Sequence, residues 1–332
     1  MRRGGAHDTV TPMKGSLRGS RILVTGGGGF IGSHLVRRLV CEHAHVAVVS
    51  TEKDPWRLRD VLGRVEYHAV SILARPLPRI VGAFRPDVVF HLAALIPARK
   101  PSAREQRKSI VTATRLLART LEQAGTVQRL ITLGAADEYG KASCPKETSV
   151  SPALTAYGRA KRAASDFLES AAKKSSFSTI VLRPPICYGP AQDFGMFVPD
   201  CARAILGGKE FTVWGEDLSR DFIYVEDLVE ATLCAATATT RKKYAAYNIG
   251  SGRGVKLTRV ARMLARPLGR EDLILSVHAR RSNHEPRSRC LDIGKALREL
   301  DWRPSTSLET GLQKTLRWYK ANRTRFSYME RT

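Results

Sequence analysis

Apolar runs and helical stripes alternate along the first half of the chain. A short apolar run at 22–24 predicts a buried strand, and further strands are predicted at 45–49, 86–94 and 129–133. Apolar side chains at helical spacing separate these strands, at Leu35, Val36, Leu39 and Val40 and again at Ile110, Leu117 and Leu121. Strands that alternate with helices predict a parallel sheet wound on both faces. We therefore expect an α/β fold, a Rossmann-type doubly wound parallel sheet.

A glycine-rich turn joins the first predicted strand to the first predicted helix. Gly26, Gly29 and Gly32 are spaced G-x-x-G-x-x-G. The first glycine permits the tight turn, the second permits close approach of a pyrophosphate, and the third permits close packing of helix on strand. The helix N-terminus offers free N–H groups to the phosphates. The sequence therefore predicts a dinucleotide site.

The second strand ends without the acidic residue that reads a ribose 2′-hydroxyl in such sites. Ser50 stands there, followed by Lys53 and Arg57. Losing the carboxylate removes repulsion of a 2′-phosphate, and the two cations are candidates to pair with one. The cofactor is thus NAD or NADP, with a lean toward NADP. The alternative is that both cations face solvent.

Tyr157 and Lys161 are spaced Y-x-x-x-K on a predicted helix. Residues four apart share one helix face, and an ammonium beside a phenol lowers the phenol's pKa. Such a tyrosine exchanges a proton with a sugar or alcohol oxygen while hydride moves to or from nicotinamide. The pair is the candidate catalytic centre.

Composition limits the remaining classes. The net charge is +24, and residues 241–332 hold 22 Lys/Arg against 8 Asp/Glu. No basic motif with interleaved aromatic residues accompanies this excess, so specific nucleic-acid binding is not expected. The six cysteines are scattered without a C-x-x-C pair, which indicates reduced thiols, a cytoplasmic location and no metal site. No apolar stretch is long enough to span a membrane.

The chain resembles the extended short-chain dehydrogenase/reductase superfamily, in the NAD-dependent epimerase/dehydratase branch that acts on nucleotide sugars. The resemblance runs from about residue 20 to 320. Its motifs are the glycine turn at 25–32, H-L-A-A at 91–94, E-Y-G at 138–140, Y-x-x-x-K at 157–161, L-R-P-P at 182–185, R-D-F-I-Y-V-E-D at 220–227, N-I-G at 248–250 and D-W-R-P at 301–304.

The resemblance implies roles for individual residues. Tyr157 is similar to the family's acid/base, and Lys161 to the partner that also holds the nicotinamide ribose. Arg220 and Arg281 resemble the arginines that hold the substrate diphosphate. The candidate cofactor-binding residues are Gly26, Gly29, Phe30, Ile31, Gly32, Ser50, Lys53, Leu92, Ala93, Ala94, Tyr157, Lys161 and Pro184.

One departure concerns catalysis directly. The family usually has Ser or Thr where this chain has Ala135, and that hydroxyl bonds the reacting sugar oxygen. Losing one positioned donor costs about 10²–10³ in rate, and Thr132 or water is a candidate substitute. Dehydratases carry T-D-E where this chain reads Ala135-Ala136-Asp137, so dehydration is not expected.

Residues 1–19 are polar, glycine-bearing and basic, which predicts a disordered tail. The resemblance implies an NAD(P)-binding Rossmann domain at 20–190 and a smaller, mainly substrate-binding domain at 191–330. A strand near 244–250 is expected to return to the main sheet, and amphipathic helices are predicted at 257–264 and 308–319.

The expected activity is hydride transfer at C4 of a nucleotide-diphosphate sugar, as a 4-epimerase if the cofactor is recycled or a 4-keto-sugar reductase if NADPH is consumed. The alternative is a catalytically impaired, cofactor-binding regulator or scaffold of the same fold. The resemblance also implies a homodimer formed through the helices at 103–124 and 155–172.

Overall fold

The computed structural model describes residues 16–240, 242–278 and 286–323. Most of the predicted tail, residues 1–15, lies outside the described residues. Ordered structure begins before residue 20, because Leu17 is buried in the core and the Gly19 N–H donates to the His43 carbonyl. Among the described residues, no helix combines the length and apolarity needed to cross a membrane.

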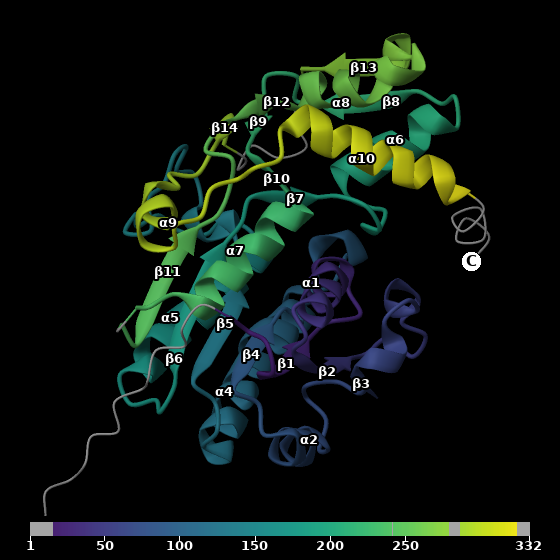
Figure 1. Ribbon diagram of the computed structural model, residues 1–332. Coiled ribbons are helices and arrows are strands. Elements are labelled where there is room, and N and C mark those ends of the chain that lie inside the picture. Colours follow the sequence, from purple (N-terminus) through teal and green to yellow (C-terminus); the bar gives the residue numbers. More distant parts are fainter. Residues whose placement is uncertain (1–15, 241, 279–285, 324–332) are drawn as a thin grey trace, which may run out of the picture.

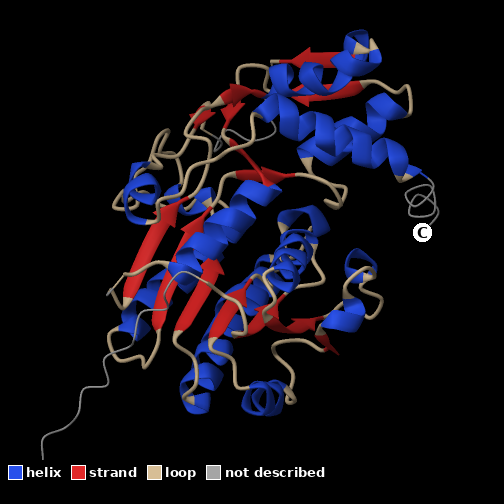
Figure 2. Cartoon of the chain, viewed as in Figure 1, coloured by secondary structure: helices blue, strands red, loops and turns tan. Residues whose placement is uncertain are grey.

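A seven-stranded parallel sheet forms the larger part of the protein, in the order β11-β6-β5-β4-β1-β2-β3 (Figures 1 and 2). The strands are β1 (Arg21–Thr25), β2 (His45–Ser50), β3 (Glu66–Ala69), β4 (Val88–His91), β5 (Arg129–Leu133), β6 (Ser178–Arg183) and β11 (Tyr244–Asn248). The order reverses at β1, where β2 lies on one side and β4 on the other. The predicted doubly wound α/β sheet is confirmed, and such a reversal point is where ligands bind in folds of this class.

Helices cover both faces of this sheet. Along β1, Ile22 and Val24 pack with α1 and α7, whereas Leu23 packs with α2, α4 and α5. These helices are α1 (Phe30–Cys41), α2 (Leu77–Phe84), α4 (Ala113–Ala124), α5 (Ala156–Ala172) and α7 (Val225–Thr237). Short helical segments occur at α3 (Ala103–Arg107), η1 (Trp56–Leu58), η2 (Leu62–Arg64), η3 (Pro97–Arg99), η4 (Lys108–Thr112), η5 (Ala136–Tyr139), η6 (Arg266–Leu268) and η7 (Glu271–Leu273). Because both strand faces are covered, successive residues are apolar rather than alternating.

The second, smaller group of elements lies beyond one end of the large sheet, at the top of Figure 1. Its strands are β7 (Ile186–Tyr188), β8 (Phe211–Trp214), β9 (Ser219–Arg220), β10 (Phe222–Tyr224), β12 (Val255–Lys256), β13 (Ile274–Val277) and β14 (Ser288–Arg289), and its helices are α6 (Phe197–Leu206), α8 (Leu257–Ala265) and α10 (Leu308–Ala321). The short helix α9 (Gly294–Glu299) instead lies beside β11 of the large sheet, where the Lys295 Nζ donates to the Ala246 carbonyl at 2.6 Å. The strands of the smaller group pair as β7–β10, β12–β9–β14 and β8–β13. The strands after residue 255 (β12, β13 and β14) thus pair with strands from the segment at 211–220, so both parts of the chain build this group.

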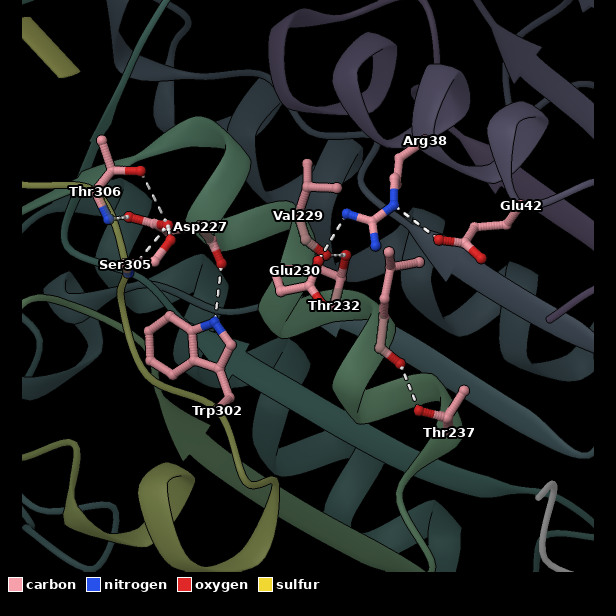
Figure 3. A network of polar contacts seen from close by, with 11 residues as sticks. Arg38, Glu42, Asp227, Val229, Glu230, Thr232, Thr237, Trp302, Ser305 and Thr306 are labelled. Atoms are coloured by element: carbon pink, nitrogen blue, oxygen red, sulfur yellow. Dashed lines mark hydrogen bonds and ion pairs between the residues drawn. The ribbon is translucent and has the colours of Figure 1, made fainter. Parts of the chain in front are cut away.

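One buried carboxylate fastens the C-terminal segment to α7 (Figure 3). Asp227, in the first turn of α7, accepts hydrogen bonds from the Ser305 and Thr306 backbone N–H groups at 3.2 and 3.0 Å and from the Ser305 hydroxyl at 2.8 Å. The Trp302 indole donates to the Asp227 carbonyl at 3.1 Å. These contacts set the path of the chain into α10.

Candidate active site

A cavity of about 730 Å³ lies at the carboxyl ends of the sheet strands. Its sheet-side wall is formed at the ends of β1, β2, β4, β5 and β6 by Gly26, Ser50, Leu92, Leu133 and Pro184. Arg220 of β9 and Arg289 of β14 contribute to the wall from the smaller group of elements. The volume falls in the range of cofactor and ligand sites.

The glycine turn shapes one end of this cavity. Gly26 has φ +74°, and a Cβ there would come within 2.7 Å of the Ala93 backbone nitrogen. A Cβ on Gly32 would collide with the Gly26 carbonyl. The helix α1 begins after Gly29, which lines the cavity. No side chain caps the first N–H groups of this helix. Those N–H groups remain available to an anion, so the turn fits a dinucleotide pyrophosphate.

The predicted cofactor residues are brought together, with one exception. The described residues that line the cavity include Gly26, Gly29, Phe30, Ile31, Gly32, Ser50, Leu92, Ala93, Ala94, Tyr157, Lys161 and Pro184. Lys53 is exposed and is not among them. Glu52, which the sequence analysis did not single out, lines the cavity in its place.

Arg57, the second cation considered for a 2′-phosphate, has a structural role instead. Its side chain is 3% exposed and its Nη2 lies 2.6 Å from an Asp193 carboxylate oxygen. Its Nε donates to the Ala191 carbonyl at 2.9 Å. The residue ties η1 to the segment after β7, and its charge is already compensated.

Tyr157 and Lys161 project into the cavity from the first turns of α5. Thr155 caps this helix, because its hydroxyl accepts the Gly158 N–H at 2.9 Å. The Lys161 Nζ lies 5.8 Å from the centre of the Tyr157 ring. Both side chains therefore reach the same cavity as the glycine turn, as the Y-x-x-x-K spacing predicts.

The electrostatics of this pair differ from the expectation. Burial, and then the Asp137 and Glu138 carboxylates, raise the pKa of the Tyr157 phenol above its ordinary value. The Lys161 ammonium donates to the Leu133 carbonyl at 2.7 Å, and burial lowers its pKa to about 8. The expected lowering of the phenol's pKa is absent here, because burial has the largest effect on the phenol and the Asp137 and Glu138 carboxylates act in the same direction.

Thr132 does not line the large cavity in the described structure. Its hydroxyl donates to the His91 carbonyl at 2.9 Å, and the residue borders a separate void of about 10 Å³. Ala135 does line the cavity, and its N–H donates to Glu138 at 2.9 Å. Neither position presents a hydroxyl to the cavity, so the missing donor is not replaced by Thr132.

Of the two arginines expected to hold the substrate diphosphate, Arg220 and Arg281, the structure describes only Arg220. Arg220 is buried in β9 and lines the cavity, and its Nη1 donates to the Ser219 carbonyl at 2.6 Å and to the Arg287 carbonyl at 3.3 Å. Arg281 lies outside the described residues.

Among the described residues, no group of three or more His, Cys, Asp or Glu side chains is placed to hold a metal ion.

Two charged residues that the sequence analysis did not assign to substrate contacts also line the cavity. Asp137 lies in η5, two residues after Ala135, and Arg289 lies in β14 with Nη1 3.5 Å from an Asp137 carboxylate oxygen. Asp137 is also near enough to Tyr157 to affect its pKa. The parallel pairing of Arg289 with Arg220 places it here, and no local sequence pattern predicts that pairing.

Comparisons with known proteins agree with this geometry. Residues 22–250 match the profile of the NAD dependent epimerase/dehydratase family. The dTDP-glucose 4,6-dehydratase of Shigella flexneri is 30% identical over 91% of this chain and 93% of its own length. The UDP-glucose 4-epimerase of Mycoplasma pneumoniae is 27% identical over 91% of this chain and 97% of its own length.

Solved structures give the same result. The UDP-glucose 4-epimerase of Thermotoga maritima, determined with UDP-glucose, has a TM-score of 0.82 and 30% identity over 91% of this chain and 99% of that one. MoeE5, determined with UDP-glucuronic acid and NAD, has a TM-score of 0.81 and 30% identity over the same shares.

Proposed function

Because this chain belongs to the NAD-dependent epimerase/dehydratase family, whose members act on nucleotide sugars, we propose that it transfers hydride at C4 of such a sugar as a 4-epimerase. The observation that supports this most is the position of Tyr157 and Lys161 in the same cavity as the glycine turn. NAD would supply the hydride acceptor there. The proposal extends to a homodimer, which the resemblance implies.

The chain's own residues have separate tasks in this proposal. Tyr157 takes the proton of the C4 hydroxyl as hydride leaves C4, and returns it when hydride is delivered to the opposite face. Lys161, while protonated, favours the ionised phenol over the neutral one, because its positive charge lies in the same cavity. Arg220 pairs with the diphosphate of the substrate, because a guanidinium fork matches two phosphate oxygens.

We propose NAD rather than NADP as the cofactor, contrary to the lean of the sequence analysis. Glu52 lines the cavity near the glycine turn, where a Cβ on Gly28 would come within 3.3 Å of its Cγ. A carboxylate there accepts a ribose 2′-hydroxyl and repels a 2′-phosphate. Arg57 is engaged with Asp193, so the cation expected to favour NADP is not directed at the site.

Dehydration is a second candidate, and Asp137 is the observation that favours it. A carboxylate that lines the cavity near Tyr157 is suited to remove or deliver a proton at a neighbouring sugar carbon. The identity with dTDP-glucose 4,6-dehydratases is as high as with the epimerase of Thermotoga maritima. Ala136 stands at the Asp position of the T-D-E motif that the resemblance implies for dehydratases, so one of that motif's two acids is missing, which favours epimerisation.

Product analysis separates these candidates. The purified protein is denatured and the released nucleotide identified by mass spectrometry, and the native protein is incubated with UDP-glucose or dTDP-glucose. A 4-epimer formed with retained NAD supports the proposal, a 4-keto-6-deoxy sugar identifies a dehydratase, and reduction of a 4-keto sugar with consumed NADPH identifies a reductase. Nucleotide binding without turnover of these and related nucleotide sugars supports the impaired regulator or scaffold.

Two variants test the assigned residues. Tyr157→Phe should lower kcat by at least about 10²-fold while NAD stays bound, because only the proton carrier is lost. Ala135→Ser should raise kcat if the missing hydroxyl limits the rate, since one positioned donor is worth about 10²–10³. Undiminished turnover by Tyr157→Phe would refute the catalytic assignment.

A further inference from the structure

Two cysteines far apart in the sequence meet beside the cavity. The Cys290 N–H donates to the Ser143 carbonyl at 2.8 Å, and the Asp292 N–H donates to the Pro145 carbonyl at 3.1 Å. The second donor lies two residues after the first, and its acceptor also lies two residues after the first acceptor. This pattern defines a parallel pairing of the two segments. Cys290 therefore lies directly opposite Cys144. Pro145 has no N–H, so it cannot donate the remaining hydrogen bond of that pair.

This register is suited to a covalent link. Paired strands lie about 4.8 Å apart, and disulfides join residues whose Cα atoms are about 4.4–6.8 Å apart. Side chains directly opposite one another point to the same face, and the two thiols are in contact. Burial and the adjoining Cys144 thiol raise the pKa of Cys290 to about 12. Cys144 is exposed to solvent, and both cysteines are free thiols in the structure.

The surrounding contacts connect this pair to the cavity wall. Arg289, which precedes Cys290, lines the cavity, and its carbonyl accepts the Asp221 N–H at 2.8 Å. The Asn248 amide donates to the carbonyls of Pro145 and Asp292 at 2.9 and 3.0 Å, and so bridges the two paired segments. A link between the thiols would fix the strand that carries Arg289 to the loop after η5.

We propose that Cys144 and Cys290 form a reversible disulfide, a modification site that fastens the Arg289 wall of the cavity. The oxidant is a low-molecular-weight disulfide such as oxidised glutathione. The Cys144 thiolate attacks one sulfur of the reagent, whose S–S bond breaks and releases one glutathione thiolate. Cys290 then loses its proton to water and displaces the second glutathione from Cys144. The protein loses two electrons and two protons, and the reagent becomes two thiols.

The test uses the full chain, treated with oxidised glutathione and digested with trypsin without reduction. The expected product is peptide 142–146 joined to peptide 290–295, with a mass lower by two hydrogen atoms than the sum of the two. Dithiothreitol should separate them. Amide hydrogen exchange should slow in both segments of the oxidised protein, because the link restrains their separation.

Two matched variants complete the test. Cys144→Ser should abolish the joined peptide and the slowed exchange, whereas Cys41→Ser, which removes another exposed thiol, should leave both unchanged. A glutathione adduct that persists on Cys144 while Cys290 stays reduced would overturn the proposal. So would a product in which Cys144 is linked to Cys41 of another copy.

Discussion

At the scale of single residues, the protonation of Lys161 is set by burial. Its pKa is lowered from 10.5 to about 8, so the ammonium is present below about pH 8 and lost above it. In the proposed reaction this charge favours the ionised Tyr157. We expect kcat to fall as the pH rises through about 8, measured as a pH–rate profile at saturating substrate.

The variant Lys161→Arg is the control, because a guanidinium does not titrate in this range. It should be slower but should lack the fall in rate near pH 8.

The effect of pH on stability should be opposite to its effect on rate, since the unfolded lysine binds its proton more tightly than the folded one. The wild type should therefore gain stability relative to Lys161→Arg between about pH 8 and 10.5, measured as the difference between their free energies of unfolding. A wild-type rate that stays level up to pH 10 would contradict this account.

Glu52 carries the second prediction at this scale. Glu52→Gln should weaken NAD binding about 10–100-fold, because a hydrogen bond to a charged acceptor contributes about 1.5–3 kcal/mol. It should weaken NADP binding less, since the repulsion of the 2′-phosphate is removed too. The measurement is titration calorimetry with each cofactor. The contact between Glu52 and Arg99 at 3.4 Å is partly exposed and adds little.

Lys53→Gln is the matched control for Glu52, one position further along the chain. Lys53 is exposed outside the cavity, so its removal should leave both affinities within a factor of two or so, as for a screened surface charge. If instead Lys53→Gln weakens NADP binding and Glu52→Gln changes neither affinity, the original lean toward NADP is right.

At the scale of elements, α7 offers a buried and an exposed carboxylate for comparison. Asp227 accepts several hydrogen bonds from the segment at 305–306, while Glu230 pairs with Arg38 at the surface, where both side chains are more than 40% exposed (Figure 3). Asp227→Ala should lower the free energy of unfolding by about 2–4 kcal/mol, because buried N–H groups lose their acceptors.

The paired variant Glu230→Ala should cost no more than about 1 kcal/mol, as exposed ion pairs contribute little. Urea unfolding of the two variants measures both values under the same conditions. Equal losses would show that Asp227 does not anchor the C-terminal segment. Neither residue lines the cavity, so NAD binding by the folded protein should be unchanged.

The features that the sequence predicts correctly are local, whereas those that it misses depend on contacts between distant segments. The glycine turn and the Tyr157–Lys161 pair are local patterns, in which neighbours along the chain become neighbours in space, and the structure places them as predicted. Arg289 and the Cys144–Cys290 pair depend on pairings across 69 and 146 residues, which no periodicity encodes. Arg57 is a candidate for NADP on sequence grounds, because nothing in the sequence indicates its pairing with Asp193, which lies 136 residues further along the chain.

At the scale of the whole molecule, the excess of 55 Lys/Arg over 31 Asp/Glu bears on the proposed dimer. The predicted interface consists of α3, α4 and α5. Along α3–α4 the exposed cations are Arg104, Arg107, Lys108, Arg115 and Arg119, whereas the exposed acids are Glu105 and Glu122. On α5 the exposed charged residues are Arg159, Asp166 and Glu169, so the whole face keeps a smaller excess of cations. The large apolar side chains that are exposed among the described residues, Val150, Trp214, Leu275 and Leu297, lie on other elements.

A symmetric dimer through this face would bring two surfaces with an excess of cations together, since a two-fold interface uses the same patch twice. Salt screens that repulsion over a Debye length of about 10 Å at 0.1 M and about 3 Å at 1 M. We therefore expect the dimer dissociation constant, measured by sedimentation, to fall as salt is raised. Arg115→Glu should abolish or reverse this salt dependence, while Arg259→Glu, on α8, should leave it unchanged. Association that weakens with salt, or that responds to Arg259→Glu alone, would place the interface elsewhere on the molecule.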